Sequence, residues 1–98
     1  MEELSPVAQE VRAVVRVVNP RGLHARPCHS LVTTALAYAS SVRVRCGPRE
    51  VDGRSILSLM TLGASAGEEL EFRAVGADAS ELVRTLVALV EGGFSELD

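Results

Sequence analysis

Apolar residues occur at every second position in several short segments of the chain, and at every third or fourth position in others. The stretch SVRVRC, residues 41–46, alternates apolar and polar side chains, as a half-buried strand does. From Ala25 to Ala39 the apolar positions instead follow the period of a helix. The two patterns predict strands at 11–18, 41–46, 49–52 and 69–75, and helices at 25–39, at 54–63 and from Asp78 or Ala79 to about Glu91.

The order of these elements is strand, helix, strand, strand, helix, strand, helix, and Gly47-Pro48 is the turn of a hairpin over residues 41–52. This order predicts the α+β class, with a four-stranded antiparallel sheet and three helices on one face, an open-faced sandwich. Residues 1–10 are acidic, contain Pro6 and show no strong period, so we expect a flexible tail. One domain is expected to follow over residues 11–98, because a chain of this length has room for one core.

Composition argues against several classes of function. Hydrophobic residues make up 47% of the chain but aromatic residues only 3%, so we expect a core of Val, Leu, Ala and Ile. Few aromatic side chains and a net charge of −3 argue against a nucleic-acid-binding surface. The sequence contains no run of about 18 apolar residues to span a membrane, and the acidic N-terminus lacks the apolar segment of a signal peptide. We therefore expect a cytoplasmic protein with reduced thiols, since two cysteines are too few for a disulfide scaffold.

The segment NPRGLHARPCHS, residues 19–30, concentrates most of the reactive side chains of the chain. His24 follows a break at Gly22 and precedes the helical period, which places it at the N-cap of the first helix. The first amides of a helix have no internal partner and carry partial positive charge, so this helix end can bind an anion. Arg26 adds a cation whose planar fork suits phosphate oxygens.

This arrangement could both accept and hold a phosphoryl group. Imidazole is a nucleophile when neutral, and the positive helix end together with Arg26 should favour the neutral form. A phosphoryl group on a ring nitrogen of His24 would meet the backbone amides of Ala25 and Arg26. The segment alone also fits a simpler interpretation, in which His24 is a turn residue that only caps the helix.

Several segments together resemble the HPr family, the histidine-containing phosphocarriers of the sugar phosphotransferase system. GLHARPC, around His24, resembles the family's histidine phosphorylation motif. RSILSLMTLG, from Arg54 to Gly63, is similar to the family's regulatory-serine segment. GASAGEELEFRAVGADA and LVALVEGGF resemble the following strand and the last helix, so the resemblance covers about residues 12–95.

The resemblance implies an activity and the residues that carry it. In this family Enzyme I, phosphorylated from phosphoenolpyruvate, transfers the phosphoryl group to Nδ1 of the histidine, and HPr passes it to an enzyme IIA domain. By this match His24 is the acceptor, Arg26 its electrostatic partner, and Ser55 the serine phosphorylated by HPr kinase in species that have that kinase. The protein is then a monomeric group carrier and not an enzyme, with no cofactor, no nucleic-acid partner and no membrane insertion. The alternatives are a regulatory or nitrogen-related HPr branch and, outside the family, a small α+β interaction module.

The second predicted helix carries further candidates. Ser55 is a favoured N-cap residue, so capping alone would explain its position. Four apolar residues follow in a helix too short to bury them all, and one or two of them are expected to form a partner-docking surface beside His24. These four are Ile56, Leu57, Leu59 and Met60.

The remaining His and Cys residues do not form a convincing metal site. His24, Cys28 and His29 are close in sequence, but two or three ligands in one turn are too few for structural zinc, so we expect no metal. Cys28 is expected to be a small packing residue, with a low-pKa thiol at the helix start as the alternative. We expect His29 on the surface and Cys46 as a buried strand thiol.

Overall fold

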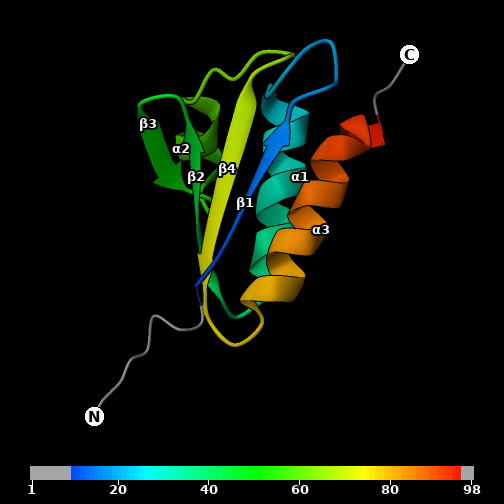
Figure 1. Ribbon diagram of the computed structural model, residues 1–98. Coiled ribbons are helices and arrows are strands. Elements are labelled where there is room, and N and C mark those ends of the chain that lie inside the picture. Colours follow the sequence, from blue (N-terminus) through cyan, green and yellow to red (C-terminus); the bar gives the residue numbers. More distant parts are fainter. Residues whose placement is uncertain (1–9, 96–98) are drawn as a thin grey trace.

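The computed structural model describes residues 10–95, which form a four-stranded sheet covered on one face by helices (Figure 1). The bounds are β1 Glu10–Arg16, α1 Ala25–Leu36, β2 Ser41–Cys46, β3 Arg49–Asp52, α2 Ile56–Met60, β4 Glu69–Val75, α3 Ala79–Glu91 and the short 3-10 helix η2 Gly93–Ser95. The elements follow the predicted order, and α3 ends before Gly92 as expected. No helix in this part of the chain is long and apolar enough to cross a membrane.

The sheet has the strand order β1-β4-β2-β3, and all neighbouring strands are antiparallel. The last strand along the chain, β4, therefore lies between the first two. β1 pairs with it from Glu10↔Val75 to Arg16↔Glu69, so the strand begins one residue earlier and ends two residues earlier than the predicted 11–18. Of the expected tail, residues 1–9 lie outside the described residues. The predicted α+β open-faced sandwich is confirmed.

The core lies between the sheet and its helices. Leu70, Phe72 and Ala74 of β4 are fully buried, and the residues between them point to the opposite face. Leu31 of α1 and Leu86 of α3 are almost completely buried in the same core cluster. Because burial of a Leu or Phe side chain contributes about 1.5–3 kcal/mol, the packing of these apolar side chains holds the helices in place on the sheet.

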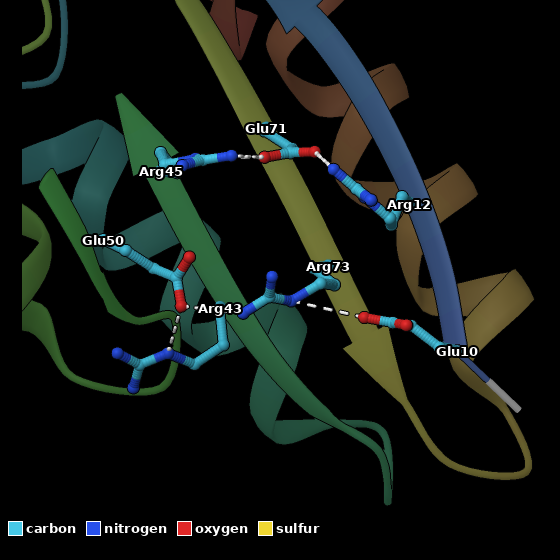
Figure 2. Close-up of polar contacts among 7 residues, drawn as sticks. All are labelled: Glu10, Arg12, Arg43, Arg45, Glu50, Glu71 and Arg73. Carbon is cyan, nitrogen blue, oxygen red and sulfur yellow. Dashed lines mark hydrogen bonds and ion pairs between the residues drawn. The ribbon is translucent and has the colours of Figure 1, made fainter. Parts of the chain in front are cut away.

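The outer face of the sheet carries arginine and glutamate side chains from all four strands (Figure 2). Glu71 of β4 accepts hydrogen bonds from Arg12 of β1 at 2.6 Å and from Arg45 of β2 at 3.1 Å. These two bonds, that from Arg12 first, hold the pKa of the Glu71 carboxyl below its ordinary value. A single carboxylate thus joins three strands.

A second carboxylate completes this network. Glu50 of β3 lies 3.2 Å from Nε of Arg43 and 2.8 Å from Nη2 of Arg73, and Arg73 also pairs with Glu10 at 3.3 Å (Figure 2). Arg73 has an arginine as its direct cross-strand neighbour on both sides, Arg12 and Arg43. Like charges in such positions repel each other, and the surrounding glutamates offset that repulsion.

Helix α1 ends at Leu36, three residues before the predicted end at Ala39. The reason is a contact with a residue distant in the sequence: the amides of Ala39 and Ser40 donate to the carboxylate of Asp78, at 2.9 and 3.0 Å. The hydroxyl of Ser40 donates to the same carboxylate. These bonds, that from the Ser40 hydroxyl first, hold the pKa of Asp78 below its ordinary value.

Helix α2 spans residues 56–60 instead of the predicted 54–63. Ser55 has an extended backbone and its hydroxyl accepts a hydrogen bond from the amide of Ser58 at 3.2 Å, so the N-cap prediction is confirmed. Arg54 lies before this N-cap residue, and its guanidinium donates to the carbonyls of Tyr38 and Ser40, at 3.3 and 3.1 Å.

Candidate functional site

His24 is the N-cap residue of α1, as the sequence predicts. Its backbone is extended (φ −90°, ψ −169°), and its carbonyl accepts the first helical hydrogen bond, from the amide of Cys28 at 3.1 Å. The amides of Ala25 and Arg26 therefore precede the hydrogen-bond ladder of the helix, and Pro27 has no amide hydrogen. The structure thus places an imidazole and two helix amides at one helix end.

The side chains at this helix end are accessible. His24 is partly exposed, and its imidazole makes no capping hydrogen bond to the helix amides, so a capping role of this side chain has no support in the structure. Arg26 is exposed, and within residues 10–95 its guanidinium takes part in no hydrogen bond or ion pair. An anion arriving here would meet the partial positive charge of the helix amides and the full charge of Arg26.

The turn before α1 is fixed by backbone and side-chain hydrogen bonds. Gly22 has φ +67°, in the left-handed region that favours glycine. Its amide donates to the carbonyl of Asn19 at 3.1 Å, and its carbonyl accepts from Asn19 Nδ2 at 2.8 Å and from the His24 amide at 3.0 Å. Asn19 is fully buried. Sequence reasoning missed Asn19, because a polar residue before a proline gives the same signal in any surface turn.

A second loop, residues 61–68 between α2 and β4, lies against this turn. The amide of Leu23 donates to the carbonyl of Ala64 at 2.9 Å. A Cβ atom added to Gly22 would lie 2.5 Å from the same carbonyl oxygen, so the two loops meet without room for a side chain. In Figure 1 both loops lie at the end of the molecule where α1 begins. The local sequence of this loop gives no sign of its contact with the turn before α1.

The two cysteines and the second histidine lie in different environments. Cys28 is fully buried and burial raises the pKa of its thiol, so its role as a packing residue is confirmed and the alternative of a low-pKa thiol is wrong. Cys46 is partly exposed instead of buried, and burial and then the charge of Glu68 raise its pKa. His29 is exposed. The residues described here contain no cluster of three or more His, Cys, Asp or Glu suited to a metal ion.

The apolar residues of α2 divide between surface and core. Leu57 is 80% exposed and Met60 45% exposed, while Ile56 is half-buried. Leu59 is fully buried in the core and cannot be part of a docking surface, so including it among the docking candidates was wrong. α2 packs against α1 and leads directly into the loop that holds the Leu23 amide. An exposed apolar surface of Leu57, Met60 and part of Ile56 remains.

Comparison with known proteins gives a consistent result. Residues 11–92 match the family model described as the PTS HPr component phosphorylation site. The phosphocarrier protein HPr of Neisseria meningitidis is 38% identical over 82 residues, which cover 84% of this chain and 92% of that protein. The structure is similar to HPr-C-His from Thermoanaerobacter tengcongensis, with a TM-score of 0.83, 35% identity and coverage of 88% and 97%. An HPr dimer from the same organism matches with a TM-score of 0.68 and 33% identity, over 96% and 98% of the two chains.

Proposed function

The chain belongs to the HPr family of phosphocarriers of the phosphotransferase system, and from this premise we propose that His24 accepts a phosphoryl group from phospho-Enzyme I and passes it to an enzyme IIA domain. The observation that carries the proposal is the position of His24 at the N-cap of α1, with an imidazole that does not cap the helix. Its neighbours Ala25 and Arg26 are exposed at the same helix end.

The transfer is a displacement at phosphorus. A ring nitrogen of His24, Nδ1 by analogy with the family, forms a bond to phosphorus while the bond between phosphorus and the donor atom of phospho-Enzyme I breaks in line with it. The oxygens of the transferred group then face the amides of Ala25 and Arg26 and the guanidinium of Arg26, which stabilise their negative charge. Transfer to the next protein reverses these steps with a new acceptor.

The exposure of the site suits a carrier better than an independent enzyme. A carrier must present the same nitrogen to a donor and then to an acceptor, so the atom has to be reachable from outside. His24 meets this requirement because it stands at a helix end on the surface. The catalytic surroundings of each transfer come largely from the partner that covers the site.

The exposed apolar surface of α2 is the proposed docking surface for both partners. It consists of Leu57, Met60 and the accessible part of Ile56. Ser55 lies at its edge and is the proposed regulatory phosphorylation site of an HPr kinase. A phosphate there adds about two negative charges to a surface that otherwise offers apolar contact, so phosphorylation weakens docking without requiring the fold to change.

The assembly and location that we propose follow from this role. A single-domain monomer in the cytoplasm leaves α2 and the end of α1 open to both partners. A solved relative forms a dimer, so mass measurement in solution is the appropriate check. A dimer that buries Leu57 or His24 would contradict the proposed use of this surface.

Incubation with phosphoenolpyruvate and Enzyme I tests the function directly. We expect one acid-labile phosphoryl group per chain, mapped to His24 by mass spectrometry, and its loss in the presence of an enzyme IIA domain. His24→Ala abolishes the labelling and His29→Ala, a matched exposed histidine of the same helix, keeps it. Labelling of His29 in the His24→Ala protein at the wild-type rate would contradict the assignment.

A further inference from the structure

One peptide group next to the candidate site is held at both of its ends. The carbonyl of Ala64 accepts from the amide of Leu23 at 2.9 Å. The amide of Ser65, which belongs to the same peptide group, donates to Oε1 of Glu68 at 2.7 Å. A chain of hydrogen bonds thus runs from the Glu68 carboxylate through the Ala64–Ser65 peptide to the residue before His24.

This chain of bonds acts on a tightly packed part of the turn. The Leu23 amide belongs to the residue directly before His24, and Gly22, which precedes Leu23, meets the Ala64 carbonyl with no space for a side chain. Rotation of the Ala64–Ser65 peptide would therefore break the bond from Leu23 or press on Gly22. Either change alters the direction in which α1 begins, and with it the direction of the imidazole.

The loop that carries Glu68 is itself firmly attached to the sheet. The amide of Val17 donates to the carbonyl of Glu68 at 2.8 Å, and the amide of Gly67 donates to the carbonyl of Val17 at 2.8 Å. Arg16 Nη1 donates to the carbonyl of Gly67 at 2.6 Å. These bonds continue the pairing of β1 with β4 beyond its last pair, so Glu68 has a fixed backbone from which to orient the peptide.

We propose that Glu68 is a positioning residue for phosphoryl transfer at His24, acting through the Ala64–Ser65 peptide and the Leu23 amide; this inference rests on the proposed function. An ionised carboxylate is a strong acceptor. By accepting from the Ser65 amide it orients the peptide and polarises it, which strengthens the acceptor at the other end, the carbonyl that binds Leu23. Glu68 does not touch the transferred group, so its effect is on geometry.

The main test compares two substitutions of Glu68. Glu68→Ala removes the acceptor for the Ser65 amide, and we expect the maximal rate of phosphoryl transfer from phospho-Enzyme I to fall about three- to tenfold. Glu68→Gln keeps an oxygen at the same position and should retain most of the rate. Since Glu68 is exposed, both proteins should fold, which thermal unfolding checks. The concentration of Enzyme I at half-saturation should stay unchanged, because the docking surface is untouched.

Two matched controls separate this role from general effects. Glu69→Ala removes the neighbouring carboxylate, which pairs with Arg16 at 3.2 Å but not with the Ser65 amide. Cys46→Ala removes a side chain near Glu68, since the Sγ of Cys46 lies 3.9 Å from Oε1 of Glu68. Both should transfer at the wild-type rate. Equal slowing in Glu68→Ala and Glu69→Ala, or a wild-type rate in Glu68→Ala, would overturn the proposal.

The amide proton shift of Leu23 gives a readout that does not depend on phosphorylation. In Glu68→Ala it should move upfield, as expected for a weaker hydrogen bond to Ala64, and in Glu69→Ala it should stay in place. An unchanged Leu23 shift overturns the positioning role even if transfer slows. If the unaltered protein accepts no phosphoryl group on His24, the proposed function itself fails, and the Leu23 shift then reports only on the loop.

A second pair of variants probes the same contact from the other loop. Gly22 and Gly63 both have positive φ, +67° and +61°, so alanine is strained at either position. Only at Gly22 would the new Cβ meet the Ala64 carbonyl; at Gly63 it meets nothing within 4 Å. Gly22→Ala should therefore slow transfer far more than Gly63→Ala. Equal transfer rates in the two variants would contradict a role for this contact.

Discussion

Arginines occur in two regions of this protein with opposite arrangements. On the outer face of the sheet, Arg12 and Arg45 share the carboxylate of Glu71, and the other arginines of that face have glutamate partners as well (Figure 2). At the N-terminal end of α1, Arg26 is exposed and within residues 10–95 pairs with no carboxylate. One region pairs its arginines with glutamates of neighbouring strands, and the other holds an arginine that pairs with no carboxylate of residues 10–95.

The difference teaches how to separate structural from functional charges in a small domain. Exposed ion pairs contribute little individually, but a carboxylate that bonds to both neighbouring strands also helps to hold the three strands together. An unpaired cation beside helix amides contributes nothing comparable to folding and keeps its full interaction for an anion. Substitutions of the same chemical kind should therefore affect stability in one region and transfer in the other.

The largest expected effect is that of Arg26→Gln on phosphoryl transfer. Loss of a charged donor to the phosphoryl oxygens should slow transfer from phospho-Enzyme I about 10- to 100-fold, with no change in melting temperature. Arg45→Gln is the matched change on the sheet and should leave the transfer rate unaltered. Rapid-quench kinetics and thermal unfolding of both proteins check this comparison, and equal rates would remove Arg26 from the site.

One exposed apolar residue of α2 and one of the sheet extend the comparison to docking. Leu57 on α2 is 80% exposed and Val14 on the outer face of β1 is 59% exposed. Leu57→Gln should raise the concentration of Enzyme I at half-saturation about three- to tenfold, because a buried interface contact is lost. Val14→Gln should leave it unchanged. The opposite result would place the docking surface on the sheet.

Ser55→Asp should act in the same direction as Leu57→Gln. The single negative charge is placed beside the apolar surface of α2, and aspartate can still cap the helix. Phosphoryl transfer should slow while the melting temperature changes little. A wild-type transfer rate would leave Ser55 with its capping role alone.

On the sheet, Glu71→Ala should lower the melting temperature by a few degrees without affecting transfer. The substitution leaves Arg12 and Arg45 without their shared partner and exposes the repulsion among neighbouring arginines. Glu69→Ala is the control, since Glu69 has one exposed partner, Arg16. A melting temperature of Glu71→Ala equal to that of Glu69→Ala would show that the shared carboxylate stabilises the fold no more than a single exposed ion pair does.

The smallest expected effect is on the loss of folding stability at acidic pH. The folded pKa of Glu71 lies below the ordinary value of about 4.3, held there first by Arg12 and then by Arg45. Its stabilising contribution is therefore present above the unfolded pKa and is lost as the pH falls through the folded pKa. Denaturation of the wild-type protein between about pH 5 and pH 2 should show a steeper loss than that of Glu71→Gln. If the stability of both proteins fell equally with pH, the lowered pKa of Glu71 would make no contribution and this prediction would be wrong.

The sequence predicted those parts of the fold that depend on local pattern. Alternation in residues 69–75 and 41–46 placed both strands at their observed bounds, because one face of each is buried in the core. The predicted end of α1 was wrong since the amides of Ala39 and Ser40 bond to Asp78 instead of continuing the helix. That contact joins residues 39 positions apart, and no local pattern contains it.

In the candidate site, too, some residues follow from a local pattern and others depend on contacts between distant segments. His24 and Arg26 were found because a glycine break before a helical period is a local signal. The hydrogen bonds of Glu68 and Asn19 were missed because they form where distant parts of a loop or turn meet, which no local pattern contains. The burial of Leu59 could not be distinguished from the exposure of Leu57 either, since a helix of five residues is too short for a periodic pattern to assign its faces.

The turn before α1 depends on a loop that comes much later in the chain. Arg12 and Glu71 are 59 positions apart in the sequence, and the Leu23 amide receives its partner from Ala64, beyond two helices and two strands. Contacts that close such long loops have a high entropic cost and tend to form late. A chain still emerging from the ribosome therefore contains its histidine segment well before it contains the loop that braces it.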